Sequence, residues 1–464
     1  MKTAQSSFSN TALQTAVASK NIANATNPAY ARRAAILATA SSGATVVQTA
    51  RAQNEALLKQ NLLSISKAAG QDTLLTGLTR IKMMLGGEDY ELAPSTYLAK
   101  LRDNLQTFAD KPNEVSLAET VVADAIDVAN ALNGATLAVQ AMRADADADI
   151  ATAVTELNRL LKEFQTYNDQ VRLGTAAGTD VNDALDQRDR LLTEISGIVG
   201  VSALKRTNND IALYTSDGTV LFETVPRTVS FSPTATYTAA VTGNQIYIEG
   251  VAIPAGAGGN TSAQGTLAAL LQVRDNVAPT FQNQLDEIAR GLIGMFAEGA
   301  NEGLFTSNGM PSVTDPGLAG VIKVNPLVVT AQGGNPMRLR DGITFTANTA
   351  GDASFSVLLN NYAAAFEETR SFATDAAITT SATILSFSTA SVGWVEQLRS
   401  AATTAGEDKG ALLGRTQEAL LSVTAVSLDE ELALLLDLEQ SYKASAKLVA
   451  AIDEMITALL NAAR

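Results

Sequence analysis

KNIANATNPAYARR, residues 20–33, is a short polar segment that combines three asparagines, a proline, a tyrosine and two adjacent arginines. Asn tolerates left-handed backbone geometry and hydrogen-bonds to its own backbone, whereas Pro fixes φ and has no N–H to donate. The order of these residues matches no catalytic motif. The segment therefore predicts the end of a helix followed by a shaped turn.

Upstream of this segment, apolar residues recur at helical spacing and predict a first helix from about residue 3 to 23. Downstream, a mainly polar link through Ser41 and Ser42 is expected to lead into a second helix. That helix is predicted from about Val47 to Leu85, where Gly86 and Gly87 end it.

The rest of the chain alternates between helical and strand-like patterns. Residues 201–252 alternate apolar and polar side chains around an Asp217-Gly218 turn, which predicts an antiparallel β insert. Residues 303–349 are predicted to be irregular and partly β. We expect further helices over 95–111, 116–171, 180–200, 266–300, 354–404 and from about 411 to the end.

The C-terminal segment carries the most regular pattern in the chain. Five apolar residues recur every seven positions, and three more lie three places after members of that series. This is an a/d seam over more than four heptads, so it needs another helix against it. Either an ordinary bundle stripe or an intermolecular coiled coil would satisfy it. The seam residues are Leu428, Leu435, Leu438, Tyr442, Val449, Ile452, Ile456 and Leu459.

The predicted fold class is α+β. The N- and C-terminal regions are expected to form an antiparallel helical bundle or coiled coil, with β-rich inserts projecting from the middle of the chain. The predicted division places 1–45 with 411–464 in a terminal coiled-coil domain. It places 46–200 with 261–302 and 354–410 in a long-helix bundle, 201–260 in a β insert, and 303–353 in an irregular, partly β insert.

Composition excludes several classes of function. The chain has 33 Lys and Arg against 48 Asp and Glu, a net charge of -15, which opposes nucleic-acid binding. It contains no Cys and no His, so thiolate and imidazole metal sites and Ser-His-Asp or Cys-His catalysis are excluded. It shows neither a secretory signal pattern nor an 18-residue apolar span, and we expect no membrane insertion.

The charge is unevenly placed along the chain. Residues 1–87 hold nine Lys or Arg and two Asp or Glu (+7), whereas residues 405–464 hold five and ten (-5). Opposite signs favour a meeting of the two ends, in one molecule or between neighbours.

Two segments have the residue spacing of known metal-binding or catalytic motifs. Asp145, Asp147, Asp149 and Glu156 are spaced like calcium-loop ligands, but Ile150 stands where the loop needs Gly, so a solvated helix face is favoured. Ser64 and Lys67 match the S-x-x-K pattern of Ser-Lys hydrolases, whose companion motifs are missing.

Two other clusters point to no chemistry of their own. Glycines at 256–259 lack the Lys and spacing of a phosphate-binding loop. Glu88, Asp89 and Glu91 form an acidic cluster of the kind that an acidic chain contains by chance. We therefore expect no enzyme, no metal and no cofactor.

The opening segment strongly resembles the N-terminal signature of the flagellar axial family, which comprises rod, hook and hook-associated proteins. In that family an Asn-Ile-Ala-Asn helix end precedes a Pro-Gly-Tyr-x-Arg turn, and Ala29 here replaces the usual Gly. The matching residues are Asn21, Ile22, Ala23, Asn24, Asn27, Pro28, Tyr30 and Arg32.

The C-terminal segment VSLDEELALLLDLEQSYKASAKLVAAIDEMITALL, residues 426–460, resembles the C-terminal motif of the same family. Ser427 replaces a common Asn. The match is carried by Leu428, Asp429, Glu430, Glu431, Gln440, Tyr442, Ala444, Ser445 and Ala446.

Interior segments are similar to the hook-associated members of that family, whereas rod members are shorter. These segments are LDQRDRLLTEISGIVGV at 185–201, GTLAALLQVRD at 265–275 and VIKVNPLVV at 321–329. The resemblance implies a homo-oligomeric ring that joins the hook to the filament, with the hook protein and the next hook-associated or filament subunit as partners.

The resemblance also implies export through the flagellar type III apparatus, so the protein would be transiently cytoplasmic and finally extracellular in the flagellum. An export chaperone would bind the C-terminal helix, with Leu435, Tyr442 and Val449 as contacts. Two alternatives remain open: a hook or distal-rod subunit, and a secreted hydrolase that uses carboxylates or the Ser64 and Lys67 pair.

Overall fold

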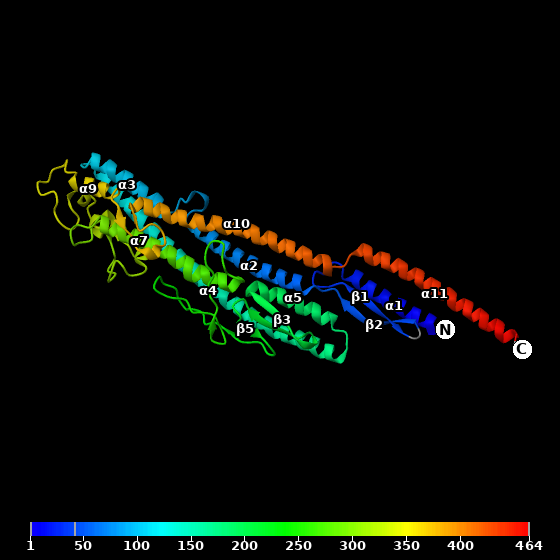
Figure 1. The fold of residues 1–464 in the computed structure, drawn as a ribbon. Coiled ribbons are helices and arrows are strands. Elements are labelled where there is room, and N and C mark those ends of the chain that lie inside the picture. Colours follow the sequence, from blue (N-terminus) through cyan, green and yellow to red (C-terminus); the bar gives the residue numbers. More distant parts are fainter. Residues whose placement is uncertain (1, 41–42, 463–464) are drawn as a thin grey trace. The chain divides into compact units, whose positions relative to one another are not determined.

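The computed structural model describes residues 2–40 and 43–462 of the chain, and most of these residues are helical (Figure 1). They divide into two compact units, each described by itself. Unit 1 comprises Met1–Ala68, Glu156–Thr228 and Lys409–Arg464, and unit 2 comprises Ala69–Thr155 and Val229–Asp408. No helix within the described residues is long and apolar enough to cross a membrane.

In unit 1 the two terminal helices pair with each other. Helix α1 (Lys2–Ala23) lies along α11 (Leu428–Ala462), and the two run in opposite directions (Figure 1). The ring of Phe8 packs edge-on against Tyr442 with centroids 5.0 Å apart. The predicted antiparallel pairing of the chain ends is confirmed.

A β-hairpin follows α1, which corrects the sequence prediction of a polar link and a helix from Val47. Strands β1 (Arg33–Ala40) and β2 (Gly43–Arg51) pair antiparallel, with Arg33 opposite Arg51. Helix α2 (Glu55–Met84) begins only after the hairpin. Four of the nine residues of β2 are the β-branched Thr or Val, which favour a strand. The predicted link residues Ser41 and Ser42 lie outside the described residues.

The remainder of unit 1 joins a helix to a small sheet. Helix α5 (Asn182–Ile198) leads into strands β3 (Val201–Lys205), β4 (Ile211–Thr215) and β5 (Val220–Phe222), which form an antiparallel sheet in that order. Gly218 turns the chain between β4 and β5 with a φ of 89°, a conformation that favours glycine. The predicted start of a β insert at residue 201 is confirmed.

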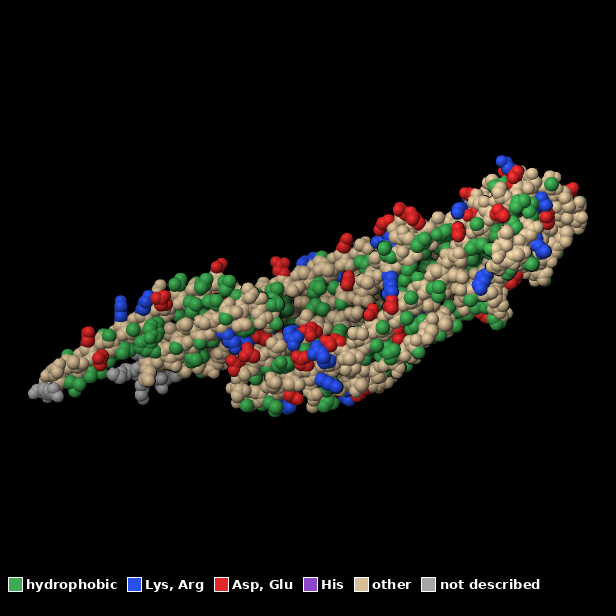
Figure 2. Space-filling model, turned by 180° about the vertical axis from the view of Figure 1, so that it is seen from behind, with side chains coloured by type: hydrophobic (Ala, Val, Ile, Leu, Met, Phe, Trp, Pro, Cys, Tyr) green, Lys and Arg blue, Asp and Glu red, His purple; other side chains and the backbone are tan. Residues whose placement is uncertain are grey.

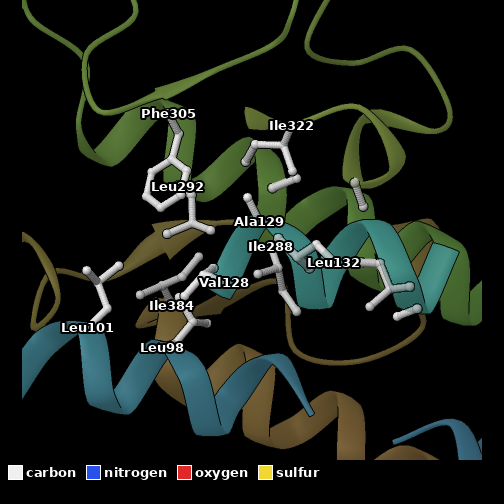
Figure 3. Close-up of a cluster of buried hydrophobic side chains, with 14 of the residues drawn as sticks. Leu98, Leu101, Val128, Ala129, Leu132, Ile288, Leu292, Phe305, Ile322 and Ile384 are labelled. Carbon is white, nitrogen blue, oxygen red and sulfur yellow. The ribbon is translucent and has the colours of Figure 1, made fainter. Parts of the chain in front are cut away.

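Unit 2 contains the largest apolar core. Its helices α3 (Pro94–Asp110) and α7 (Ala278–Met295) pack with the first part of α4 (Val115–Ala177), the predicted long helix. Figure 3 shows side chains from these segments and the neighbouring loops meeting in one cluster. The labelled members are Leu98, Leu101, Val128, Ala129, Leu132, Ile288, Leu292, Phe305, Ile322 and Ile384.

The helix predicted over 266–300 runs from Thr266 to Met295 and contains a change of pitch. Helix α6 (Thr266–Gln272) continues through a π-helical turn at Val273–Val277 into α7. The change of pitch lies beside Pro279, which has no N–H for the helical ladder. It also buries Arg274, whose Nη1 lies 2.6 Å from Asp147 Oδ1.

The C-terminal helices differ from their predicted bounds of 354–404 and from 411. Helix α9 is short (Val357–Ala365), and α10 (Ile384–Thr424) passes through 404–411 without a break. The chain breaks instead before Ser427, whose hydroxyl accepts a hydrogen bond from the Glu430 N–H at 3.4 Å. This Ser-x-x-Glu arrangement starts α11 as an N-terminal cap.

The other strands are two-residue pairs in connecting segments. Those between residues 229 and 324 agree with the predicted β insert and with the partly β character of 303–349, whereas the pair at 370–371 and 381–382 lies within 354–404 and corrects the prediction of a helix there. The four-part domain division stays a prediction. These elements are β6 (Val229–Ser230), β7 (Tyr247–Ile248), β8 (Val251–Ala252), β9 (Phe305–Thr306), β10 (Lys323–Val324), β11 (Arg370–Ser371) and β12 (Ser381–Ala382), with a short helix α8 (Arg338–Asp341).

We expect Leu292→Ala to lower the free energy of unfolding of unit 2 by about 2–5 kcal/mol, because the truncated side chain leaves a cavity in a fully buried position. Leu137→Ala on α4 is the matched control, since Leu137 is 71% exposed, and its change should stay within about 0.5 kcal/mol. Urea unfolding curves measure both. Equal effects of the two substitutions would contradict the position of the core.

Candidate assembly site around the N-terminal turn

The side chain of Asn21 holds the turn that follows α1. Its Nδ2 donates to the Arg33 carbonyl at 2.8 Å, and its Oδ1 accepts from the Arg33 N–H at 3.0 Å and from the Tyr30 hydroxyl at 2.8 Å. Asn21 is fully buried. Because an amide offers a donor and an acceptor together, it pairs with both backbone groups of Arg33 as a neighbouring strand would.

The residues between α1 and β1 form a compact turn. The Asn27 side chain accepts from the Ala29 N–H at 3.1 Å, and its carbonyl accepts from the Tyr30 N–H at 3.1 Å. Pro28 supplies the fixed φ that such a turn uses. Ala29 is not among the residues with positive φ, so Ala in place of Gly leaves this turn unstrained.

Two arginines at the base of the hairpin contact three carboxylates of α5. Arg33, 3% exposed, places its Nη2 2.5 Å from Asp183 Oδ1 and 2.9 Å from Asp186 Oδ2. Arg51, opposite Arg33 in the hairpin, lies 2.6 Å from Asp186 and 2.7 Å from Asp189. We call these five residues the Arg-Asp cluster. It fixes the base of the hairpin to α5.

The Arg-Asp cluster was not among the sites predicted from the sequence. Asp183, Asp186 and Asp189 recur every three residues and so lie on one face of α5, which is the signal that could have found them. Arg190, four residues after Asp186 on the same helix, pairs with Glu194 at 2.5 Å, and Asp186 pairs with the two arginines of the hairpin.

A second contact joins the turn to the start of α11. Arg32 Nε lies 2.7 Å from Glu431 Oε1, and the Arg32 N–H donates to the Thr424 carbonyl at 2.8 Å. Glu431 is fully buried, and its Oε2 has no hydrogen-bond partner within residues 2–40 and 43–462. The opposite charges of the two chain ends therefore meet within one molecule at this contact.

Helix α1 covers only one column of the C-terminal seam. Leu438 is buried, at 7% exposed, and in the same heptad column Glu431 and Ser445 are buried too. Ser445 Oγ lies 2.8 Å from Ser7 Oγ. Of the other predicted seam residues, Leu435 and Ile452 are half-buried, whereas the exposed ones are Leu428, Tyr442, Val449, Ile456 and Leu459.

The remaining predicted motif residues lie around the turn. Of these, Ile22, Asn24 and Arg32 are half-buried, and Ala23, Asn27 and Pro28 are exposed. The Asn24 Nδ2 donates to the Lys20 carbonyl at 2.9 Å and so helps to end α1.

Two family models match the chain. The model of the flagellar hook-associated protein FlgK helical domain matches residues 78–312, half of the chain. The chain belongs to the flagellar hook-associated protein FlgK family. The model of the flagellar basal body rod FlgEFG protein C-terminal region matches residues 417–462, which include α11.

Relatives of this FlgK-family chain carry the name flagellar hook-associated protein 1. The protein of Bacillus subtilis is 22% identical over 440 residues, which cover 87% of this chain and 82% of the relative. The protein of Salmonella typhimurium is 24% identical over 217 residues, covering 44% and 39%. A solved structure, the flagellar hook junction protein FlgK from Burkholderia pseudomallei, gives a TM-score of 0.44 at 19% identity, covering 54% of this chain and 46% of that one.

The Ser-Lys pattern of this FlgK-family chain lies within helix α2. Ser64 is 3% exposed, and its Oγ donates to the Gln60 carbonyl of the preceding turn at 3.0 Å. A nucleophilic serine needs a base within hydrogen-bond distance. Lys67 makes no such bond to Ser64, whose hydroxyl bonds within its own helix, so the pair does not have the geometry of a Ser-Lys nucleophile.

The calcium-loop spacing lies inside the continuous helix α4, where its carboxylates take separate roles. Asp147 is buried and accepts from Tyr237 at 2.6 Å and from Arg274. Asp145 pairs with Arg80, Asp149 is exposed and Glu156 pairs with Arg159. No group of three potential metal-binding residues occurs in the described part of the chain.

The two remaining clusters are also structural. The Gly256 N–H donates to the Ala268 carbonyl at 2.9 Å, and the Gly259 carbonyl accepts from Gln71 at 2.8 Å, so the glycine segment is a held connector. In the acidic cluster of the α2–α3 turn, Glu88 bonds Lys82 at 2.7 Å, while Asp89 and Glu91 are exposed.

We expect Asn21→Ala to release β1 from α1 and to lower the free energy of unfolding of unit 1 by about 2–4 kcal/mol, because it removes three hydrogen bonds and leaves buried groups unpaired. Asn24→Ala is the matched control, since it removes a single bond at a half-buried position. Urea unfolding, with hydrogen exchange at the Arg33 amide, measures the effect. An unchanged rate of hydrogen exchange at the Arg33 amide in Asn21→Ala would contradict the role of the Asn21 side chain in holding β1.

The Arg-Asp cluster should weaken in acid. Burial opposes ionisation of Asp183, but hydrogen bonds from Arg33 and Lys20 outweigh it and lower the pKa of Asp183. A carboxylate with a lowered folded pKa stabilises the protein above its unfolded pKa of about 3.9, and this contribution is lost as the pH falls through the folded value. The side chain is 75% exposed, so solvent screening keeps the contribution small.

Urea unfolding at pH 5 and pH 3 measures this loss. Asp183→Asn should lose less stability between the two pH values than the native chain does. Asp437→Asn is the matched control, since Asp437 is exposed and makes no ion pair within the described residues. Equal acid sensitivity of Asp183→Asn and the native chain would show that Asp183 does not contribute.

Proposed function

We propose that this chain is a structural subunit of the bacterial flagellum that assembles as a ring joining the hook to the filament. Membership of the FlgK family and the alignment with the Bacillus subtilis relative over 82% of its length support this role. The observation that carries the proposal is the half-covered seam of α11. The hook protein and the next hook-associated or filament subunit are the proposed neighbours.

The seam is half-covered because α1 is a single, slim partner. From residue 446 to 462 the side chains of α11 are exposed except for the half-buried Ile452. Leu448, Met455 and Leu459 are 61%, 60% and 71% exposed. A contiguous apolar surface of this kind marks a protein interaction site. Figure 2 shows hydrophobic side chains exposed along the terminal helices.

The exposed apolar surface of α11 is also suited to chaperone binding and export, the steps that precede assembly. We propose that the chain is exported through the flagellar type III apparatus and becomes extracellular in the flagellum. A dedicated chaperone would cover the C-terminal helix in the cytoplasm. Leu435, Tyr442 and Val449 lie in the exposed or half-buried column of the seam and are the proposed chaperone contacts. This role requires no catalysis, and we propose that the chain is not an enzyme.

Electron microscopy of flagella from a strain that lacks this protein tests the junction role. The full-length chain should restore filaments. A chain cut before Ser427, or a chain with Leu448→Gln, Met455→Gln and Leu459→Gln, should leave hooks without filaments and flagellin in the medium. These three side chains are exposed, so their substitution should leave the fold of the monomer intact.

Lys447→Gln with Thr457→Gln is the matched control, since both positions are exposed on the same helix, and it should support filaments. Normal filaments on the truncated chain would overturn the junction role. Missing hooks in the deletion strain would favour the alternative of a hook or distal-rod subunit.

A further inference from the structure

Unit 1 contains a cavity of about 900 Å³. The second half of α10 and residues from α2, α5, β3 and β4 form its walls, and six of the apolar lining residues are Leu58, Leu62, Leu185, Leu192, Leu204 and Leu420. This volume would hold about 30 water molecules at the density of the liquid. Apolar walls of this extent favour an apolar occupant.

Two polar side chains on the cavity wall are buried with unused hydrogen-bonding atoms. Arg188 is 4% exposed. Its Nη1 donates to Asn168 Oδ1 at 3.2 Å and to the Asn209 carbonyl, but its Nε has no partner in the described part of the chain. Asn61 is 6% exposed, and its Oδ1 likewise has no hydrogen-bond partner among the described residues. Unused atoms of this kind destabilise a folded protein unless a ligand satisfies them.

Arg188 differs from the other cationic side chains of the cavity wall. Arg51 pairs with Asp186, Arg190 with Glu194, and Lys205 with Glu55, whereas Lys59 is exposed. Arg188 is buried and makes no ion pair within the described residues. Its burial lowers its pKa to about 10. The cavity wall therefore carries a buried guanidinium that makes no ion pair within the described residues, although Asp189, Asp210 and Glu55 lie near enough to raise its pKa.

These features indicate a polypeptide occupant. An amide side chain such as Asn61 can donate to and accept from a peptide group, and a guanidinium binds a carboxylate or a carbonyl oxygen. A small inorganic anion would bind the guanidinium alone. It would leave the apolar walls uncovered and the Asn61 Oδ1 without a hydrogen-bond donor. The occupant should therefore be a segment with large apolar side chains and a nearby carboxylate.

The end of α11 has these properties. Leu448, Ile452, Met455 and Leu459 follow one another at spacings of four, three and four, and so lie on one face of the helix. Asp453 and Glu454 flank this face, and neither makes an ion pair within the described residues. Segment 446–462 thus combines a convex apolar face with carboxylates, the groups that an ion pair with Arg188 requires.

We propose that segment 446–462 of a second copy of this chain occupies the cavity, where its carboxylates meet Arg188 and its backbone meets Asn61. The proposal rests on the proposed ring. A contact between two different surfaces of identical subunits is heterologous, and a heterologous contact closes into a ring when its rotation permits. The two surfaces would then be covered together as subunits add.

Cross-linking between full-length chains tests this contact, because the chain contains no Cys of its own. Leu421→Cys, at the cavity wall and 37% exposed, is mixed with Met455→Cys and treated with a short bismaleimide. We expect a covalent heterodimer on denaturing gels. The matched control replaces Leu421→Cys by Leu137→Cys, which is 71% exposed in unit 2, and should give little heterodimer.

Charge variants identify the partners. Arg188→Met in the Leu421→Cys chain, or Asp453→Lys with Glu454→Lys in the Met455→Cys chain, should lower the heterodimer yield. Loss of one charge-assisted contact weakens binding by about tenfold or more. The tail variants act at exposed positions and do not depend on refolding of the cavity. Arg159→Met, on the exposed face of α4, should leave the yield unchanged.

Several outcomes would overturn the proposal. These are absence of the heterodimer, equal yields from Leu137→Cys and Leu421→Cys, or a yield unaffected by both sets of charge variants. Displacement of the cross-link by decanoate would assign the cavity to a small amphiphile instead. The junction role is tested separately: filaments that form with a chain unable to cross-link would refute the cavity contact and leave the junction role standing.

Discussion

The amide of Asn21 is the interaction on which the organisation of unit 1 depends. By pairing with both backbone groups of Arg33, it sets where β1 begins and in which direction the chain leaves α1. The register of the hairpin then places Arg51 opposite Arg33, and both arginines face the carboxylates of α5. Arg32, one residue earlier, points to α11. One side chain thus fixes three contacts that are far apart in sequence.

The buried charges of this region favour specificity over stability. Removing Arg33, Arg51 and Asp186 from water opposes folding, and the attraction between these charges largely offsets that penalty without exceeding it. The side chain of Asp183 stays exposed. Within the described residues, Arg33 Nε and Glu431 Oε2 remain without hydrogen-bond partners, so the pairing is incomplete. What such a cluster does provide is geometry, because a shift of the hairpin by one residue would separate Arg33 and Arg51 from Asp186. The charges therefore define the register more than they strengthen the fold.

Elements whose evidence is local could be predicted from the sequence, and those that depend on distant residues could not. The heptads of α11 and the long apolar period of α4 predict these two helices directly, and the turn at Asp217-Gly218 predicts the hairpin that it closes. The hairpin of β1 and β2 was missed because its alanines and the Ser-Gly sequence at the junction of the two strands also suit a helix or a linker. Its position is decided by Asn21, Asp183 and Asp186, and the two carboxylates lie about 150 residues away.

The seam of α11 shows the same division within a single helix. Its apolar residues could be predicted from the sequence. The column that α1 covers also includes the polar Glu431 and Ser445, which were predicted as motif residues but not as members of the packing seam. These polar members matter because Glu431 needs Arg32 and Ser445 needs Ser7, so they select α1 in one register. The exposed column holds no such partner-specific group apart from Tyr442, which meets Phe8. A helix with one specific face and one apolar face binds its own chain selectively and keeps the apolar face for other subunits. Such a division lets the monomer fix its own termini while the remaining apolar area contributes only when the subunit assembles.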